Sequence, residues 1–214
     1  MYEYNPVGLI RPKTTWWTSD WHFNHERIIE LCRRPFSSVE EMNETIITNH
    51  NALVCPGDDV FVLGDVALGR INEFPALVQR MNGRKYLIPG NHDRCWKGHK
   101  RVRGIDTELY INAGFEILSG ISMFSDTGWL MCHFPAKGDS LAADRYTDFR
   151  PTIGDNEWLL HGHVHDKWQI NSRQINVGVD AWDFKPVSAE EIQQIIDLTN
   201  ADFSCVLDDD LTDL

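Results

Sequence analysis

The sequence has 214 residues, of which 42% are hydrophobic and 24% are charged, and this composition excludes a disordered, collagen-like or coiled-coil chain. No apolar run approaches the roughly 20 residues that a membrane span requires, so we expect one soluble domain without a membrane partner. The formal net charge of −12 disfavours a protein that coats nucleic acid nonspecifically, although it leaves room for a locally basic groove.

The first half of the chain alternates between strand patterns and helix patterns. Residues rich in β-formers predict strands at 14–18, 59–63 and 84–88. Apolar residues at helical spacing predict helices at 26–33, from Ser38 onward and at 71–81. This alternation favours an α/β fold in which at least some strands pair in parallel.

The second half is richer in strands. Five shorter strands are predicted, at 115–118, 121–124, 129–132, 157–160 and 174–179. Ser188, followed three residues later by Glu191, has the pattern of a capping box at the start of a final helix. We interpret residues 1–200 as a single domain and residues 201–214, which contain aspartates but no Lys or Arg, as an acidic C-terminal tail.

The cysteines and the N-terminus indicate where the protein resides. The chain has five cysteines and no C-x-x-C pair, which fits a reducing compartment better than a disulfide framework. Residues 1–13 contain no apolar segment of signal-peptide length. We therefore expect a cytoplasmic protein.

Five short clusters rich in Asp, Asn and His follow the apolar strand patterns. Ligands in open α/β sheets gather beyond the carboxyl ends of the strands, so separate strands can deliver these side chains to one crevice. Residues two apart in an extended segment point the same way, which allows each D-x-H or H-x-H pair to share one target. Glycines at 64, 90 and 162 permit close approach of the backbone. The clusters are Asp20-x-His22, Gly64-Asp65, Gly90-Asn91-His92-Asp93, His133 and Gly162-His163-x-His165.

Seven side chains in these clusters are of metal-ligand type. A mixture of carboxylate and imidazole suits manganese, iron, zinc or nickel better than calcium. Seven ligands are too many for one tetrahedral ion, and they suit two ions roughly 3.5–4 Å apart that share a carboxylate, as in phosphoester hydrolysis. The predicted ligands are Asp20, His22, Asp65, Asn91, His133, His163 and His165.

These clusters, which span residues 20–165, resemble those of the calcineurin-like metallophosphoesterase superfamily, and its small bacterial and phage members are the most similar. The resemblance implies a four-layer α-β-β-α sandwich, with two mixed sheets flanked by helices. It implies two divalent ions, with manganese favoured and iron, zinc, nickel or magnesium as alternatives. It assigns the first ion to Asp20, His22, Asp65 and His165, and the second to Asp65, Asn91, His133 and His163, with Asp65 bridging.

The resemblance also implies a mechanism, in which a metal-bound hydroxide attacks phosphorus in line. His92 would stabilise the transferring group or protonate the leaving oxygen. We take His92 and its neighbour Asp93 as the catalytic residues, and what orients His92 stays open. Phosphoprotein phosphatases carry an aspartate where this chain has Leu68 and a glutamate where it has Asp93, so that activity is disfavoured.

We expect the substrates to be phosphodiesters, such as nucleotides or short nucleic acids, although a nucleic-acid partner is not required. The alternatives are a broad-specificity phosphomonoesterase and a non-catalytic scaffold of the same fold. The scaffold is disfavoured because all seven ligands and His92 are present. No oligomeric state is predicted.

A basic stretch directly follows the Asn91–His92 cluster. We consider two interpretations of this stretch: its positive charges steer phosphate groups toward the metals, or it is an ordinary solvated loop. Trp96 lies within it and could stack on a base. Its basic residues are Arg94, Lys97, Lys100, Arg101 and Arg103.

Overall fold

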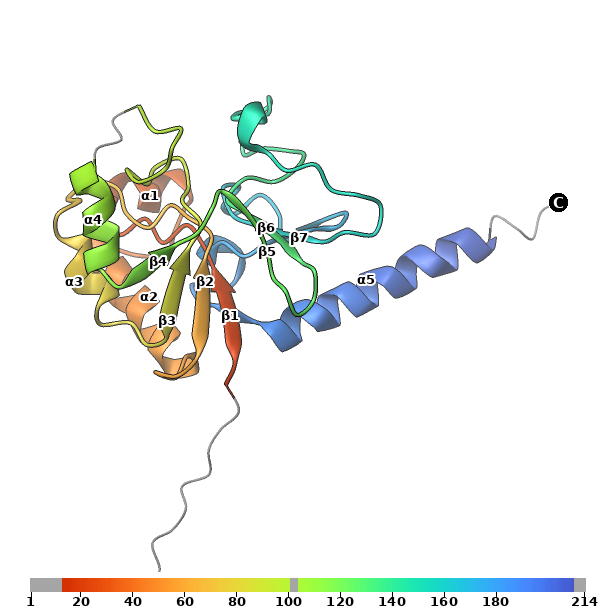
Figure 1. The fold of residues 1–214 in the computed structure, drawn as a ribbon, viewed down its shortest axis with the longest axis horizontal. Coiled ribbons are helices and arrows are strands. Elements are labelled where there is room, and N and C mark those ends of the chain that lie inside the picture. Colours follow the sequence, from red (N-terminus) through yellow and green to blue (C-terminus); the bar gives the residue numbers. More distant parts are fainter. Residues whose placement is uncertain (1–12, 101–103, 210–214) are drawn as a thin grey trace, which may run out of the picture.

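The computed structural model describes residues 13–100 and 104–209, and its centre is a pair of five-stranded sheets (Figure 1). The first sheet has the order β10-β1-β2-β3-β4, in which β1 to β4 are parallel and β10 is antiparallel to β1. Its strands are β1 (Thr15–Thr18), β2 (Asp59–Val62), β3 (Arg84–Leu87), β4 (Phe115–Ile117) and β10 (Val187–Ser188).

The second sheet has the order β5-β6-β7-β9-β8, with β6, β7 and β9 parallel and both edge strands antiparallel to their neighbours. The predicted fold class, two mixed sheets with flanking helices, is confirmed. The strands are β5 (Ile121–Met123), β6 (Leu130–Cys132), β7 (Leu159–His161), β8 (Ile170–Asn171) and β9 (Gln174–Asn176).

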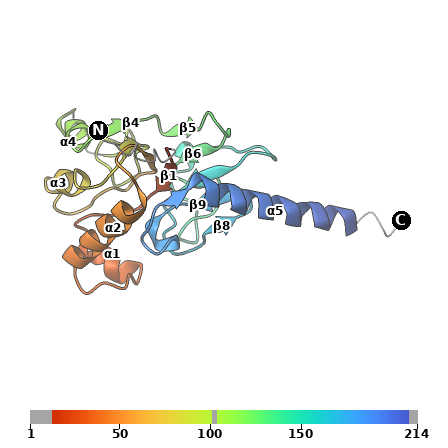
Figure 2. The same ribbon diagram turned by 90° about the horizontal axis from the view of Figure 1, so that it is seen from below.

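Four helices lie on one side of the first sheet, and a fifth projects away from the sandwich (Figures 1 and 2). In the described residues, no helix is both long and apolar enough to cross a membrane. The helices are α1 (Glu26–Leu31), α2 (Val39–Leu53), α3 (Phe74–Val78), α4 (Gly104–Asn112) and α5 (Ala189–Asp209), with 3-10 turns at η1 (Thr147–Phe149) and η2 (Val179–Ala181).

The two faces of the first sheet bury different cores. Successive residues of a strand point to opposite faces, so Trp16 packs among the helix-side residues and Trp17 packs between the sheets. In α5, Ile192 and Ile196 join the core between the sheets. The core between the sheets therefore holds the two sheets together.

Some elements differ from the sequence-based expectation. The helix expected at 71–81 is shortened to α3, because Pro75 lacks an amide N–H and occupies the first helical turn. Helix α4 was not predicted, and β8 and β10 are too short to show an alternating pattern. Helix α5 continues through residue 201, where the predicted acidic tail begins, and residues 210–214 lie outside the described part.

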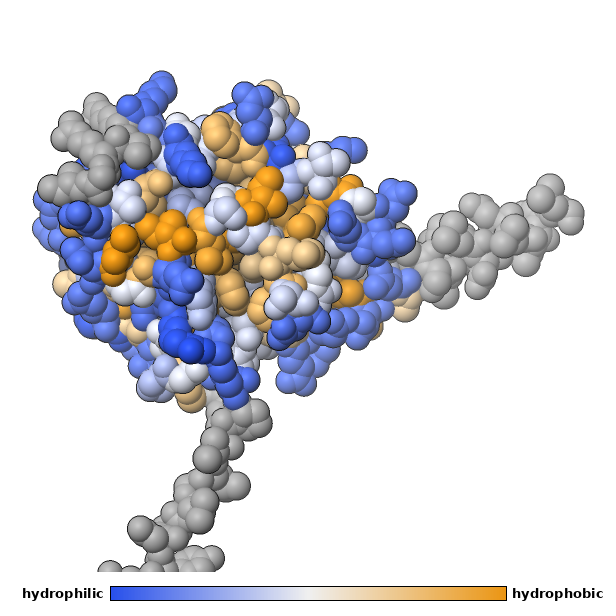
Figure 3. Space-filling view, viewed as in Figure 1, coloured by the Kyte–Doolittle hydropathy of each residue, from blue (hydrophilic) through white to orange (hydrophobic). Residues whose placement is uncertain are grey.

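An apolar surface covers part of the face seen in Figure 1, over β4 and β5 (Figure 3). On β5 the exposed apolar side chains are Ile121 and Met123. Because β5 is an edge strand, no neighbouring strand covers its outer side.

Both hydrogen bonds of the predicted capping box at the start of α5 are formed, and they offer a test of the fold. Ser188 Oγ accepts from Glu191 N at 3.2 Å, and Glu191 Oε2 accepts from Ser188 N at 2.8 Å. We expect Ser188→Ala to lower the free energy of unfolding by about 1 kcal/mol in a urea titration of the metal-free protein. Ser125→Ala, whose hydroxyl donates only to exposed Asp126, is the control, and an equal loss in both variants would contradict the assignment.

Candidate metal centre

The predicted ligands follow five parallel strands, three in the first sheet and two in the second. Lateral backbone bonds align the loops beyond these strands: Asp20 N donates to Gly64 O at 3.0 Å, and Gly162 N donates to His133 O at 3.0 Å. The carboxyl ends of both sheets therefore open on the same edge of the sandwich, as the sequence indicated.

The carboxylate of Asp65 lies at the centre of the cluster. Its Oδ2 is 3.5 Å from His22 Nε2, which follows β1, and 3.5 Å from His133 Nε2, which follows β6. Its Oδ1 accepts the backbone N–H of His92 at 2.9 Å. One buried carboxylate thus faces imidazoles from both sheets, which is the geometry of a shared ligand.

The other predicted ligands lie on either side of Asp65. Ligand atoms of Asp20, His22 and His165 all lie within 4.8 Å of one another, as do those of Asp20, Asp65 and His133. Asn91 Oδ1 is 3.2 Å from His133 Nε2.

His163 takes a different position in the cluster. Its ring centroid lies 5.2 Å from that of His133, but its Nε2 faces Asp139 Oδ2 at 3.4 Å and Arg145 Nη2 at 3.1 Å. The structure therefore brings all seven predicted residues together, with Nε2 of His163 facing Asp139 and Arg145.

Hydrogen bonds select the tautomer of two histidines. His133 Nδ1 lies 2.7 Å from the carbonyl oxygen of Leu63, so Nδ1 carries the proton and Nε2 has the lone pair. His165 Nδ1 lies 3.1 Å from Asp180 Oδ2, so Nδ1 of this ring also carries a proton. In each case Nδ1, the outer nitrogen that faces away from the cluster, donates to an acceptor of the protein. This is the usual arrangement around metal-bound histidine.

Several buried polar atoms fit a cation. Asp20 Oδ1 and both ring nitrogens of His22 are buried, and among the described residues they have no hydrogen-bond partner. A buried carboxylate oxygen without a donor is costly unless it meets a positive charge. The mixed oxygen and nitrogen donors suit manganese, iron or zinc, so this chain's residues fit divalent metal ions.

Burial controls the protonation of the cluster. It lowers the pKa of His22 well below its ordinary value and lowers the pKa of His163 to about 3, so both imidazoles are neutral at pH 7. Burial raises the pKa of Asp20. Burial acts in the same direction on Asp65, but electrostatic interactions with the imidazoles of His133 and His92 hold the pKa of that carboxyl below its ordinary value.

His165 behaves oppositely to the other cluster histidines. Burial alone would lower its pKa, but the hydrogen bond to Asp180 raises that pKa well above its ordinary value. A metal ion that binds Nε2 therefore displaces a proton, and binding should release it to solvent.

Five of the predicted ligands have left-handed backbone conformations. The φ angles of Asp20, His22, Asp65, His163 and His165 are 58°, 52°, 54°, 73° and 52°. Non-glycine residues adopt this region rarely and at a cost of about 1 kcal/mol or more each. The surrounding contacts hold these residues in conformations that local preference disfavours, as is typical of functional sites.

Two glycines make the approach of the strands possible. Gly64 has φ 90° and packs directly on the backbone of Gly90. A Cβ placed on Gly90 would lie 2.8 Å from His133 Cε1 and 2.8 Å from Asp65 N. Neither position has room for a side chain, because the loops after β2 and β3 must touch for their polar residues to meet.

His92 and Asp93, the predicted catalytic residues, are placed very differently. His92 is 41% exposed, and its Nε2 is 4.0 Å from Asp65 Oδ2. Asp93 is fully buried, and its carboxylate accepts N–H bonds from Asp65, Val66 and Gly90 at 2.8–3.0 Å. Burial and the charge of Asp65 raise the pKa of Asp93 to about 7. Asp93 therefore positions the two loops, and its carboxylate does not face the open side with His92.

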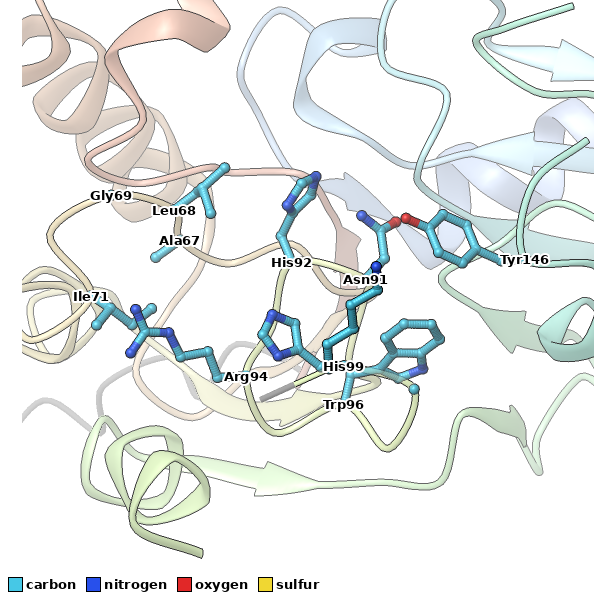
Figure 4. A pocket seen from close by; sticks show the side chains of 12 residues that line it. Ala67, Leu68, Gly69, Ile71, Asn91, His92, Arg94, Trp96, His99 and Tyr146 are labelled. Atoms are coloured by element: carbon cyan, nitrogen blue, oxygen red, sulfur yellow. The ribbon is translucent and has the colours of Figure 1, made fainter. Parts of the chain in front are cut away.

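A cavity of about 380 Å³ opens beside His92 (Figure 4). Leu68 and Ile71 line one part of it, and Arg94 and Lys100 of the basic stretch line another. Arg101 and Arg103 lie outside the described residues.

Trp96 does not offer a free stacking surface. The indole is 7% exposed and packs against Phe149 with ring centroids 4.7 Å apart. It belongs to a small core with Phe134, so the prediction that it could stack on a base is not supported by its position.

Four residues of the site were not assigned by sequence reasoning. Asp139 and Asp180 contact His163 and His165, and Arg145 and Arg34 hold those carboxylates. The side chain of Arg34 is buried, so it does not offer its charge to a substrate. These four residues lie outside the five polar clusters, so the sequence pattern did not single them out.

Comparisons with known proteins agree with this geometry. A family model described as calcineurin-like phosphoesterase matches residues 13–167. The chain is 34% identical to the gene 66 protein of Mycobacterium phage L5, over 85% of this chain and 93% of that protein. It is 34% identical to an uncharacterized protein of Methanocaldococcus jannaschii, over 84% and 89%. The crystal structure of a protein of unknown function from Aquifex aeolicus superposes with a TM-score of 0.63 at 25% identity, over 86% of this chain and 99% of that one.

The central position of Asp65 predicts how the protein binds metal. Metal-free protein loaded with Mn²⁺ and desalted should retain two ions per chain by mass spectrometry of the metal. Asp65→Asn should retain less than one, because both ions lose a shared charged ligand. Asp126→Asn, at an exposed turn, is the matched control. Retention of two ions by Asp65→Asn, or of only one by the wild type, would contradict the assignment.

Proposed function

The chain belongs to the calcineurin-like phosphoesterase family, and from that premise we propose that it hydrolyses phosphate esters at a centre of two divalent metal ions. The observation that carries the proposal is the position of Asp65, whose Oδ2 is 3.5 Å from histidines of both sheets. We propose Asp20, His22, Asp65 and His165 as ligands of one ion, and Asp65, Asn91, His133 and His163 as ligands of the other.

The chemistry divides between the ions and the chain. Two divalent ions, when bound, supply Lewis acidity that withdraws charge from phosphate oxygens and makes water more acidic. Asp65 holds its oxygen between the two ligand groups, and the buried imidazoles around it keep bulk water away. The exposed side of the cluster, where His92 lies, is left for the substrate.

His92 is placed to handle the leaving group. Its backbone N–H is fixed by Asp65 Oδ1, while its imidazole is 41% exposed and faces the cavity. An imidazole in this position can donate a proton to the departing alkoxide as the bond to phosphorus breaks. Its location beside a ligand, rather than among the ligands, supports this role.

Phosphodiesters are the proposed substrate class. The cavity beside His92 has an apolar part, with Leu68 and Ile71, and a cationic part, with Arg94 and Lys100. A leaving group that carries both a carbon framework and a further anionic group would match both parts, which favours nucleotides or short nucleic acids over simple monoesters.

A substrate panel with Mn²⁺ tests the proposal. It compares bis-p-nitrophenyl phosphate, p-nitrophenyl phosphate, cyclic nucleotides and short oligonucleotides. We expect chelator-sensitive hydrolysis that favours diesters and that is lost in Asp65→Asn. Preference for the monoester would identify a phosphomonoesterase instead, and no hydrolysis by protein holding two ions would indicate a non-catalytic scaffold.

The role of His92 predicts a dependence on the leaving group. His92→Ala should keep both ions and lose roughly 10²–10⁴ in kcat, the usual scale for a proton-transfer group. The loss should shrink for p-nitrophenolate, which needs little protonation, and be largest for alkoxide leaving groups. An equal loss across the series, or loss of a metal ion, would contradict the role.

The basic stretch predicts a salt-dependent effect on KM. Lys97 and Lys100 are exposed, so Lys97→Ser/Lys100→Ser should raise KM at low salt and leave kcat unchanged. The effect should fade by about 0.1 M salt, where the screening length is about 10 Å. The control is Lys13→Ser/Arg84→Ser, with the same charge change at the opposite end of the strands. Equal KM values in both double variants at low salt would show that the stretch is ordinary surface.

A further inference from the structure

A buried ion pair adjoins His165. Arg34 Nε and Nη2 donate to the two oxygens of Asp180, each at 2.8 Å, and the two side chains are 0% and 3% exposed. Asp180 Oδ2 also lies 3.1 Å from His165 Nδ1. The carboxylate is therefore shared between a guanidinium and the outer nitrogen of a proposed ligand.

Arg34 also contacts the turn that carries two further proposed ligands. Its Nη2 donates to the carbonyl oxygen of Asp20 at 2.8 Å, and its Nη1 donates to that of Trp21 at 3.0 Å. The flanking residues Asp20 and His22 have φ angles of 58° and 52°, conformations that need external support. One guanidinium thus holds the left-handed turn after β1 and the carboxylate behind His165.

We propose that Asp180 and Arg34 are positioning residues for one of the two metal ions, the ion assigned to Asp20, His22 and His165. This inference rests on the proposed ligand roles given above. Asp180 fixes the ring of His165 and its tautomer, and Arg34 fixes the D-x-H turn against the same carboxylate. The ion pair thus connects the turn after β1 to the segment that carries His165, although the two segments are far apart in the chain.

The pair also excludes a competing arrangement. Cys32, His165 and Asp180 place ligand-type atoms within 4.8 Å of one another and could in principle bind an ion of their own. Both oxygens of Asp180 already accept from Arg34, and the guanidinium charge beside them repels a cation. Asp180 therefore supports a ligand and does not act as one.

Asp180→Asn removes this support with little change in volume. The carboxylate makes three contacts: Oδ1 with Arg34 Nε, and Oδ2 with both Arg34 Nη2 and His165 Nδ1. An amide has one acceptor oxygen and a donating NH2 group, and it lacks the negative charge, so at least one of these contacts is lost and the others are weakened. Loss of such an outer partner typically weakens metal binding by about 10–100-fold. The effect should fall on one ion, because other groups hold the ligands proposed for the second ion alone. His133 contacts Leu63 O and Asn91, and His163 contacts Asp139 and Arg145.

The test is a titration of the metal-free full chain with Co²⁺, followed by calorimetry and by the visible absorption of the bound ion. We expect Asp180→Asn to raise one of two Kd values by 10–100-fold, to change the cobalt spectrum of that site, and to leave the other Kd within about threefold. Glu44→Gln, which breaks an exposed bidentate pair with Arg80, is the matched control and should change neither Kd. Two unchanged Kd values in Asp180→Asn, or an equal rise in both, would overturn the proposal.

A double variant separates positioning from stability. Asp180→Asn leaves Arg34 with an uncompensated buried charge, so the metal-free variant should melt below the wild type. Asp180→Asn/Arg34→Met removes that charge and should recover melting temperature, but the weakened Kd should persist because His165 still lacks its carboxylate. Recovery of both quantities would show that the pair serves only the fold. Wild-type protein that binds two ions and hydrolyses no phosphate ester would contradict the proposed function and leave this test intact.

Discussion

The buried carboxylate of Asp65 is the constraint on which the rest of the site depends. Its Oδ2 lies 3.5 Å from His22 Nε2 and 3.5 Å from His133 Nε2, so the two sheets must present their carboxyl ends at one edge and at a fixed separation. The core between the sheets, with Trp17 at its centre, sets that separation. Gly64 allows the loops after β2 and β3 to touch. The packing between the sheets and the glycines in the loops therefore determine where Asp65 Oδ2 lies.

Residues that bind no metal in this account hold the ligands in place. The carboxylate of Asp93 accepts hydrogen bonds from three backbone N–H groups in the loops after β2 and β3. The carbonyl oxygen of Leu63 accepts a hydrogen bond from Nδ1 of His133. Such contacts offset the cost of left-handed backbone at the ligands. Among the described residues, the buried acceptor oxygen Asp20 Oδ1 has no hydrogen-bond partner, which is costly in the protein alone and favourable when a cation lies beside it. These contacts hold the proposed ligands in place without an ion.

The sequence predicted which polar residues lie together better than it predicted the elements that support them. Metal-binding side chains are few in kind and follow strands, so residues such as His133 could be placed from chemical type and position alone. The alternation of strands and helices predicted an α/β fold with parallel pairing, and the sandwich of two mixed sheets was implied by the resemblance to the family. Helix α4 was missed, and the roles of Arg34 and Asp180 were missed because their contact joins segments 146 residues apart, outside any motif. Asp93 was grouped with His92 by adjacency, whereas the turn after β3 sends the two side chains in different directions.

Anomalous diffraction at the manganese edge, from crystals grown with Mn²⁺, tests the central claim most directly. The account predicts two peaks per chain, roughly 3.5–4 Å apart, on either side of Asp65 Oδ2, as expected for a shared carboxylate. One peak should lie toward His22 and the other toward His133. A single peak at full occupancy, or two peaks that do not share Asp65, would contradict the assignment of this cluster as a dinuclear centre.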